Sequence, residues 1–369
     1  MTNKKFFYLI IIIFFAILIY ILSGIYGLID YKKYKIHLFE NSIDLNFHYK
    51  YSNRINHLRE RKKDGKTTDY LFNNIGNIKS QNKVLFLGDS WFQQINKNDH
   101  NSSYKSLEEF SMKNNFEITN AGITSFSPSL MQLQYGILKN EFNIDPSILI
   151  IHIEQTDIGD EYCRYRKIKK YDHQNSLVSI KRFDYDKEIF NGLKIYRYTE
   201  IKLNNKNLGK FFKLSNFTIE YFFKKNFFRI GKIIENGWMT DKQLNYYKCR
   251  FEVIQSFLEN ENKDANEYFK KTLVEFFNYL NSQTRVKKII ITSFPHKKHL
   301  QNNYKTNVSN LIDDVLADYS SKFEHLNFSN SSYENFNLDK LYQTNDIASH
   351  LRPKYHNEIF IKKIIEKLN

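Results

Sequence analysis

The first feature of the hydrophobic pattern is an uncharged apolar stretch over residues 6–29, directly after Lys4 and Lys5. Crossing the hydrocarbon core of a bilayer takes about 20 apolar residues, whereas the apolar part of a secretory signal has about 7 to 15. The length favours a retained transmembrane anchor over residues 1–33, with cleavage after the small residues at 23–24 as the alternative. Lysines flank both ends, so charge gives no orientation. Because a single anchor before one long domain commonly leaves that domain outside the cytoplasm, we expect it in the periplasm or at the cell surface.

The rest of the chain divides in two by its pattern. Residues 34–81 are polar and mixed, and we interpret them as a stalk or an N-terminal embellishment. From residue 82 to 369, short apolar runs alternate with amphipathic segments, which indicates one further domain. An insertion over about 164–263, rich in Phe, Tyr and Lys, interrupts this domain. Packing is the simpler role for its aromatic side chains, and a substrate platform is the alternative.

Four short apolar runs have the length of buried parallel strands, and helical patterns separate them. The predicted strands are 83–88, 116–120, 147–154 and 286–292, and the predicted helices begin at 106 and 127 and cover 264–280 and 353–368. Strands that alternate with helices in this way predict an α/β fold, a three-layer doubly wound parallel sheet of the flavodoxin-like type. In such sheets, ligands bind outside the carboxyl ends of the strands.

The composition raises the question of a nucleic-acid partner, because the chain is strongly basic. The chain has 369 residues, and its 55 Lys and Arg against 40 Asp and Glu give a net charge of +15. A surplus of this size often indicates an anionic partner. No zinc-finger spacing, RNA-binding aromatic motif or arginine cluster accompanies it, so we expect no nucleic-acid partner.

Two cysteines, Cys163 and Cys249, are too few for a disulfide framework or a four-ligand metal site. A bridge between them is compatible with an oxidising compartment, but two separately buried thiols are the simpler expectation. No cofactor motif and no set of metal ligands stands out in the sequence, so neither a cofactor nor a metal is predicted.

Polar residues stand where each predicted strand ends. These segments are Gly88-Asp89-Ser90 after the first strand, Asn120-Ala121-Gly122 after the second, Gln155-Thr156-Asp157 after the third, and Asp346 with His350 before the final helix. A serine at a helix N-terminus lies beside backbone N–H groups that can bind an oxyanion, and a glycine lets the backbone approach a substrate oxygen. A nearby carboxylate can orient the imidazole that deprotonates Ser90.

These segments, met in this order, resemble the four sequence blocks of the SGNH (GDSL-like) hydrolase superfamily, in a membrane-anchored bacterial form. The resemblance covers about residues 83–369 apart from the insertion. It implies a serine esterase or acyltransferase in which Ser90 is the nucleophile, His350 the base and Asp346 the acid. The oxyanion hole that it implies would be built from Ser90, Gly122, Gln155 and Thr156.

Two positions depart from the family pattern. Thr156 stands where the third block has an asparagine, so its hydroxyl or the Gln155 amide would have to donate to the oxyanion. Three residues separate Asp346 from His350 where the family has two, so the loop between them must bulge. Asp339 is the alternative acid.

Each candidate also has a simpler structural role. Ser90 could only cap a helix, and His350 could be a surface histidine. Other candidates are expected to be structural: Asp89 as a hydrogen-bonding residue, His152 as a core histidine, and His296 and His299 as solvated loop residues. For His296 and His299, which follow the fourth predicted strand, lining the site is the alternative. For the charged group after the third strand, substrate orientation and a structural ion-pair network are equally open; it comprises Asp157, Asp160, Glu161 and Arg164.

The function implied by the resemblance is ester hydrolysis or acyl transfer, with O-acetyl groups of a cell-surface glycan as the expected substrate. One alternative is a lipase or lysophospholipase whose aromatic insertion forms an acyl groove near the bilayer. Another is a non-catalytic protein of surface-polysaccharide biosynthesis that keeps the fold. The expected partners are therefore an ester-bearing glycan or lipid and the membrane itself.

Overall fold

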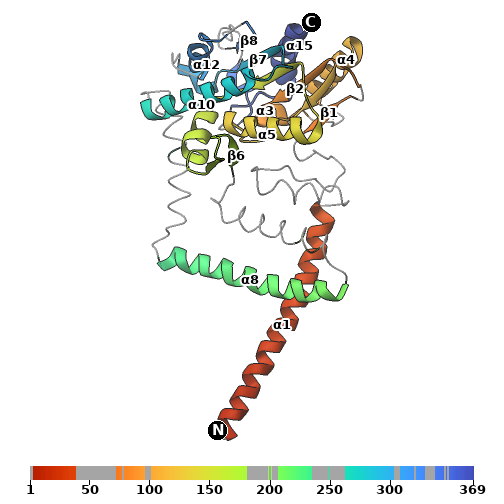
Figure 1. Ribbon diagram of the computed structural model, residues 1–369, viewed down its shortest axis with the longest axis vertical. Helices are drawn as coiled ribbons and strands as arrows, with labels where there is room; N and C mark the ends of the chain where they lie inside the picture. Colours follow the sequence, from red (N-terminus) through yellow and green to blue (C-terminus); the bar gives the residue numbers. More distant parts are fainter. Residues whose placement is uncertain are drawn as a thin grey trace. The chain divides into compact units, whose positions relative to one another are not determined.

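The computed structural model describes residues 3–38, 72–76, 79–95, 101–180, 198, 201, 207–234, 249, 262–302, 308–319, 321–328, 337–344, 346 and 349–369. They fall into two compact units, which are treated separately below (Figure 1). The first unit contains helices α1 (Asn3–Leu38) and α8 (Asn207–Ile234), and the second contains both sheets. Most of the predicted stalk, residues 39–71, lies outside the described residues.

The main sheet of the second unit has six strands in the order β1-β3-β2-β4-β7-β8. Their bounds are β1 (Asn73–Ile75), β2 (Lys83–Leu87), β3 (Glu117–Asn120), β4 (Ile148–His152), β7 (Lys288–Ser293) and β8 (Phe323–Asn327). β1 pairs antiparallel with β3, and all other pairs are parallel. The five parallel strands have the flavodoxin-like order, so the predicted doubly wound sheet is confirmed.

The sheet is covered on both faces, which is why its central strands read as continuous apolar runs. Side chains alternate between faces along a strand. Val84 and Phe86 belong to the core cluster shared with α4 (Ser102–Asn114), η3 (His356–Ile361) and α15 (Lys362–Leu368). The intervening Leu85 and Leu87, also fully buried, point to the opposite face. On that side α10 (Lys263–Asn281) contacts both α5 (Pro128–Phe142) and α12 (Val308–Leu316).

The remaining elements are short. They are α3 (Ser90–Gln93), α6 (Thr156–Gly159), η1 (Asp160–Tyr165), the two-stranded sheet of β5 (Lys169–Tyr171) and β6 (Leu177–Ile180), α11 (Lys297–Asn302), α13 (Leu338–Leu341) and α14 (Pro353–Tyr355). The predicted final helix over 353–368 is built from α14, η3 and α15 in succession.

Two helix starts show how local signals compete. The spacing from residue 106 predicted a helix start there, but α4 begins at Ser102, because the Asn101 side chain accepts a hydrogen bond from the Tyr104 N–H and caps the helix earlier. α5 begins at Pro128 as predicted. The Ser127 hydroxyl there does not cap the helix but donates to Glu161 at 2.7 Å.

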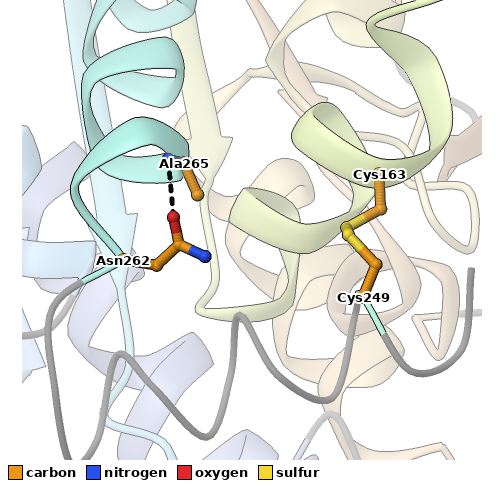
Figure 2. The surroundings of a disulfide bond; sticks show 4 residues. All are labelled: Cys163, Cys249, Asn262 and Ala265. Atoms are coloured by element: carbon orange, nitrogen blue, oxygen red, sulfur yellow. Dashed lines mark hydrogen bonds between the residues drawn. A yellow bond between two sulfur atoms is a disulfide. The ribbon is translucent and has the colours of Figure 1, made fainter. Parts of the chain in front are cut away.

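The expectation of two separate thiols is wrong, because Cys163 and Cys249 form a disulfide across a sequence separation of 86 residues. Cys163 lies in η1, and Figure 2 shows the bridge near the start of α10, where Asn262 caps the helix through the Ala265 N–H. Cys163 directly precedes the predicted insertion over about 164–263 and Cys249 lies within it, so the bridge ties part of the insertion to η1. Local sequence gives no signal for this pairing, since only the fold brings the two cysteines together.

We expect the double variant Cys163→Ser/Cys249→Ser to lower the free energy of unfolding by about 2 to 4 kcal/mol, because the unfolded chain regains the entropy of a long closed loop. Thermal unfolding with and without reductant measures the effect. Reductant should lower the melting temperature of the wild type and leave that of the double variant unchanged. If the wild type and the double variant melt at the same temperature without reductant, the bridge does not stabilise the fold.

Candidate functional site

The site forms at the carboxyl ends of β2 and β4, where the strand order changes direction and open α/β sheets bind their ligands. β2 ends at Leu87, and after two residues α3 begins at Ser90. The Asp89 carboxylate accepts a hydrogen bond from the Trp91 N–H at 2.9 Å and caps the helix, so the predicted structural role of Asp89 is confirmed. Ser90 remains partly exposed, while Trp91 and Phe92 are buried and anchor α3.

Three side chains from distant parts of the chain meet at this point. The Ser90 Oγ lies 2.6 Å from the His350 Nε2. The His350 Nδ1 hydrogen-bonds the Asp346 Oδ2, and the same oxygen accepts the His350 backbone N–H at 2.7 Å. This serine–imidazole–carboxylate arrangement can transfer a proton from the hydroxyl to the ring while the carboxylate fixes the tautomer and orientation of the ring.

The backbone directly before His350 has an uncommon conformation. Ser349 adopts a left-handed conformation with φ of 55°, and its N–H donates to the Asp346 carbonyl at 3.2 Å. A non-glycine residue in this region is uncommon and marks a position that the surrounding structure determines.

The alternative acid, Asp339, lies away from the imidazole. It is exposed and pairs with Lys297 at 2.6 Å, which lowers the pKa of Asp339 below its usual value. Its backbone carbonyl accepts the Arg352 guanidinium at 3.0 Å. Asp339 therefore helps to hold the His350 loop and does not orient the ring.

The electrostatic surroundings of His350 favour its protonated form. Burial opposes a charge on the ring, but the hydrogen bond to Asp346 and the nearby charges of Glu154 and Asp346 outweigh it and raise the pKa of His350. A raised pKa makes the ring a stronger base towards Ser90.

The Trp91 ring packs beneath Ser90 and His350. Its ring centroid lies 5.9 Å from that of His350, 4.8 Å from His152 and 6.1 Å from His356. His152 is fully buried and its Nδ1 contacts the Thr292 hydroxyl at 3.0 Å, so it is the core histidine that the sequence indicated. Burial first, and the charge of His350 second, lower the pKa of His356 to about 3. Both deeper histidines are therefore neutral.

Gly122 holds the loop after β3 against α3. A Cβ at this position would lie 2.3 Å from the Phe92 Cβ, so only glycine fits. Its N–H donates to the Asn120 Oδ1 at 3.0 Å, and the Asn120 amide in turn donates to the Phe92 and Ile95 carbonyls, each at 2.9 Å. The described conformation thus engages the Gly122 N–H within the chain.

The two candidates after β4 are likewise engaged. The Thr156 hydroxyl donates to Glu154, and the Gln155 Oε1 accepts the Val308 N–H at 3.0 Å. The Gln155 Nε2 is buried and has no hydrogen-bond acceptor among the described residues. Of the two side chains, Gln155 therefore carries the donor that the described residues do not use.

A cluster of buried carboxyl groups, which the sequence pattern does not indicate, lies beside these donors. Asp89, Glu154 and Asp157 each present an oxygen within 4.8 Å of the others. Burial raises the pKa of Asp89 to about 7 despite a hydrogen bond to Glu154. Burial, followed by the charges of neighbouring carboxylates, raises the pKa of Glu154 and Asp157 well above their usual values. These shifts favour the protonated form of each carboxyl group without fixing how many protons the cluster holds.

Glu154 is the member that sequence reasoning missed, because it ends an apolar run and belongs to none of the recognised segments. Among the described residues, these three carboxyl groups are the set with the spacing to hold a cation. Ligand carboxylates must first lose their protons, and burial opposes that loss.

Three of the neighbouring charged residues, Asp160, Glu161 and Arg164, make contacts of the structural kind expected of an ion-pair network. Glu161 is fully buried and accepts hydrogen bonds from the Ser127 hydroxyl, the Ser129 N–H and the Ser129 hydroxyl, at 2.7, 2.8 and 3.0 Å. Lys169 pairs with Glu161 at 2.9 Å, and Arg164 lies 3.6 Å from Asp160. These side chains tie η1 to the start of α5.

The expectation for His296 and His299 is wrong. Both follow β7, but they are only 6% and 5% exposed, with ring centroids 6.1 Å apart. A loop that packs against its own domain buries its side chains, which sequence alone does not reveal.

Comparisons with known proteins give only structural likenesses. No protein-family profile matches the chain, and no curated protein sequence matches it. A GDSL-like lipase from Bacteroides thetaiotaomicron shares 11% identity over 78% of this chain and 89% of its own, with a TM-score of 0.35. A putative acylhydrolase from Bacteroides fragilis shares 11% over 79% and 90%, with a TM-score of 0.34. A catalytic mutant of an acetylxylan esterase from Geobacillus stearothermophilus shares 11% over 78% and 94%, with a TM-score of 0.38.

Such identities and TM-scores are too low to transfer an activity. What the site does must therefore be argued from the chain's own side chains.

The carboxyl cluster predicts an unusual dependence of stability on pH. Because the folded pKa of each member is raised, the folded state binds more protons than the unfolded state, and stability is lost as the pH rises from about 4 through about 7. Asp89→Asn keeps the capping oxygen but removes one titrating group. We expect the stability of this variant, relative to the wild type, to rise with pH by up to about 1.4 kcal/mol per pH unit.

Thermal unfolding of both proteins at pH 5, 6 and 7 tests this, with the exposed Asp318→Asn as control. Parallel curves for Asp89→Asn and the wild type would mean that the cluster ionises normally.

Proposed function

We propose that this chain is a serine esterase of the SGNH (GDSL-like) type, in which Ser90 attacks the ester carbonyl and His350 is the general base. The observation that carries the proposal is the 2.6 Å contact between the Ser90 Oγ and the His350 Nε2. A serine hydroxyl is a weak nucleophile until a base accepts its proton, and a hydrogen bond of this length is the geometry that such a transfer needs.

In the proposed reaction, the proton of Ser90 passes to the His350 Nε2 as the Ser90 Oγ bonds to the acyl carbon. His350 then gives this proton to the departing alkoxide. Asp346 stabilises the charged ring between the two steps through its bond to Nδ1. Water or a sugar hydroxyl takes the acyl group from Ser90 in the second half-reaction, with His350 again accepting and returning a proton.

The oxyanion donors that we propose are the N–H groups of Ser90 and Gly122 with a side chain from residues 155–156. Gln155 suits this role better than Thr156, because its Nε2 is not used by the described residues whereas the threonine hydroxyl donates to Glu154. The Gly122 N–H would be shared with Asn120. Loss of one such donor typically costs about a hundred- to a thousandfold in rate.

The proposed substrate is an O-acetylated cell-surface glycan, with hydrolysis or acyl transfer as the outcome. Ser90 is partly exposed, and the side chains of His350 and Asp346 are 15% and 18% exposed, so a group pendant on a polymer can reach them. The disulfide supports a location outside the reducing cytoplasm. α1 is the one helix among the described residues with the length and composition to cross a membrane, and we propose that it anchors the enzyme.

Labelling with a fluorophosphonate probe tests the nucleophile. We expect a single adduct on Ser90, mapped by mass spectrometry, and none on Ser90→Ala. Ser103 is a matched control within the same chain, because its hydroxyl lies 2.8 Å from the His356 Nδ1 but is buried and its histidine stays neutral. Ser103→Ala should label like the wild type. No adduct on a folded wild-type protein would favour a non-catalytic role in surface-polysaccharide biosynthesis.

The rate of acetyl-ester hydrolysis should depend on the protonation of His350. The base must be neutral, so kcat/KM falls as the pH drops through the raised pKa of His350, above about 6.5. Asp346→Asn removes the charge that raises this pKa. We expect the acidic limb to move to lower pH and kcat to fall by roughly a hundred- to ten-thousandfold.

Asp339→Asn is the control for this series, since Asp339 is exposed and pairs with Lys297. Its pH profile should match that of the wild type. If Asp339→Asn and Asp346→Asn lose activity equally, Asp346 does not have the assigned role.

A further inference from the structure

We propose that α8 is an interfacial helix that lies in the membrane surface, with one apolar side inserted among the lipids. The inference rests on the proposed anchoring by α1 and concerns only the unit that these two helices form. It identifies the environment of the exposed phenylalanines of α8.

α8 packs closely against α1. Gly24 and Gly27 of α1 meet it: a Cβ on Gly24 would lie 2.4 Å from the Ser215 hydroxyl, and one on Gly27 would lie 2.6 Å from that of Thr218. Small residues three or four apart on a helix are the usual means by which helices approach closely at a membrane. The Tyr20 hydroxyl also donates to the Phe212 carbonyl at 3.3 Å. The two helices cross in Figure 1.

This crossing falls at a defined depth. Gly24 comes about 19 residues after Lys5, which at about 1.5 Å per residue places it about 28 Å along the helix axis. The hydrocarbon core of a bilayer is about 30 Å thick. If Lys5 marks one surface of the bilayer, α8 therefore meets α1 at the other surface.

Polar contacts begin just beyond the crossing. The Tyr198 hydroxyl donates to Asp30 at 2.5 Å, and Tyr198 packs edge-on against Tyr31. The Lys210 ammonium lies 5.5 Å from the centre of the Tyr31 ring. Tyrosines and lysines with apolar stems are typical of the boundary between lipid and water.

The exposed side of α8 is too apolar for water. Phe212, Phe222 and Phe223 are 51%, 63% and 53% exposed, although α8 buries Leu214 and Phe217 against its partners within the unit. At 100° per residue, Phe212 and Phe223 lie within about 20° of each other on the helix, and the exposed Lys213 lies about 80° to 100° away. Apolar side chains on one side and lysines on another are the pattern of helices that lie in a membrane surface with anionic lipids.

Spin-label accessibility on the full-length protein tests this placement. The disulfide uses both native cysteines, so an introduced cysteine is the only free thiol. Nitroxide labels are attached to Phe223→Cys, to Lys213→Cys as the matched position on the other side, and to Phe14→Cys in the middle of α1. The proteins are reconstituted in vesicles of phosphatidylcholine and phosphatidylglycerol. Collisions with oxygen report lipid, and collisions with a nickel chelate report water.

We expect the label at 223 to favour oxygen over the chelate several-fold and the label at 213 to show the reverse, with the label at 14 deepest in lipid. A label at 223 that meets the chelate, or neither reagent, while the label at 14 is in lipid would overturn the proposal for α8 and leave the anchor in place. A label at 14 in water would refute the anchor itself and this inference with it. Unchanged thermal unfolding of each variant shows that the fold is kept.

Discussion

The burial of Trp91 is the interaction on which the site depends. Trp91 and Phe92 are 1% and 0% exposed, and they hold the short helix α3 in the core although it has too few residues to be stable alone. Ser90 is thereby fixed at the end of β2. The same indole ring packs under His350, so one buried side chain positions both the hydroxyl and the imidazole. The aligned strand ends bring the two segments to this edge, and Trp91 sets their separation there.

Fixing Ser90 at the end of β2 requires a buried carboxyl group beside it, and this burial lowers the stability of the fold. Asp89 caps α3, yet it lies in a buried space shared with Glu154 and Asp157, where ionised carboxylates are strongly disfavoured. The raised pKa values of the three groups favour their protonated forms, which lowers that cost. The hydrogen bonds that remain fix the segment after β4, which carries Gln155 and Thr156, beside Ser90. The buried carboxyl cluster thus holds the hydrogen-bond donors of residues 155–156 in place, while its burial lowers the free energy of unfolding.

The first unit follows a different physical rule. α1 exposes large apolar side chains along most of its length, and α8 exposes three phenylalanines, although both helices pack well against each other. In water such surfaces would favour aggregation, whereas in lipid they need no protein partner. Under the proposal for α8, the insertion that contributes this helix belongs to the membrane attachment and is not a substrate platform. Some of its aromatic side chains, such as Phe217, are buried by packing, and others, such as Phe222, are exposed.

The sequence by itself determined the features that depend on local pattern. Apolar runs of strand length, helix caps and a long uncharged stretch indicated the parallel sheet, its helices and α1, because periodicity and length are read within a few residues. Residues after two predicted strands pointed to Ser90 and Gly122, since parallel strands share one carboxyl edge, and His350 was indicated by its place before the final helix. β1 and β8 were missed because one has only three residues and the other is only partly buried.

Only the tertiary structure decided what depends on distance through space. The disulfide joins residues 86 apart, the choice of Asp346 over Asp339 depends on a left-handed Ser349, and the protonated cluster needs β2 and β4 side by side. Burial of His296 and His299 likewise depends on how a loop packs. A sequence records which groups are present and their local spacing, but the solvation and charge that fix their chemistry arise only when distant segments meet.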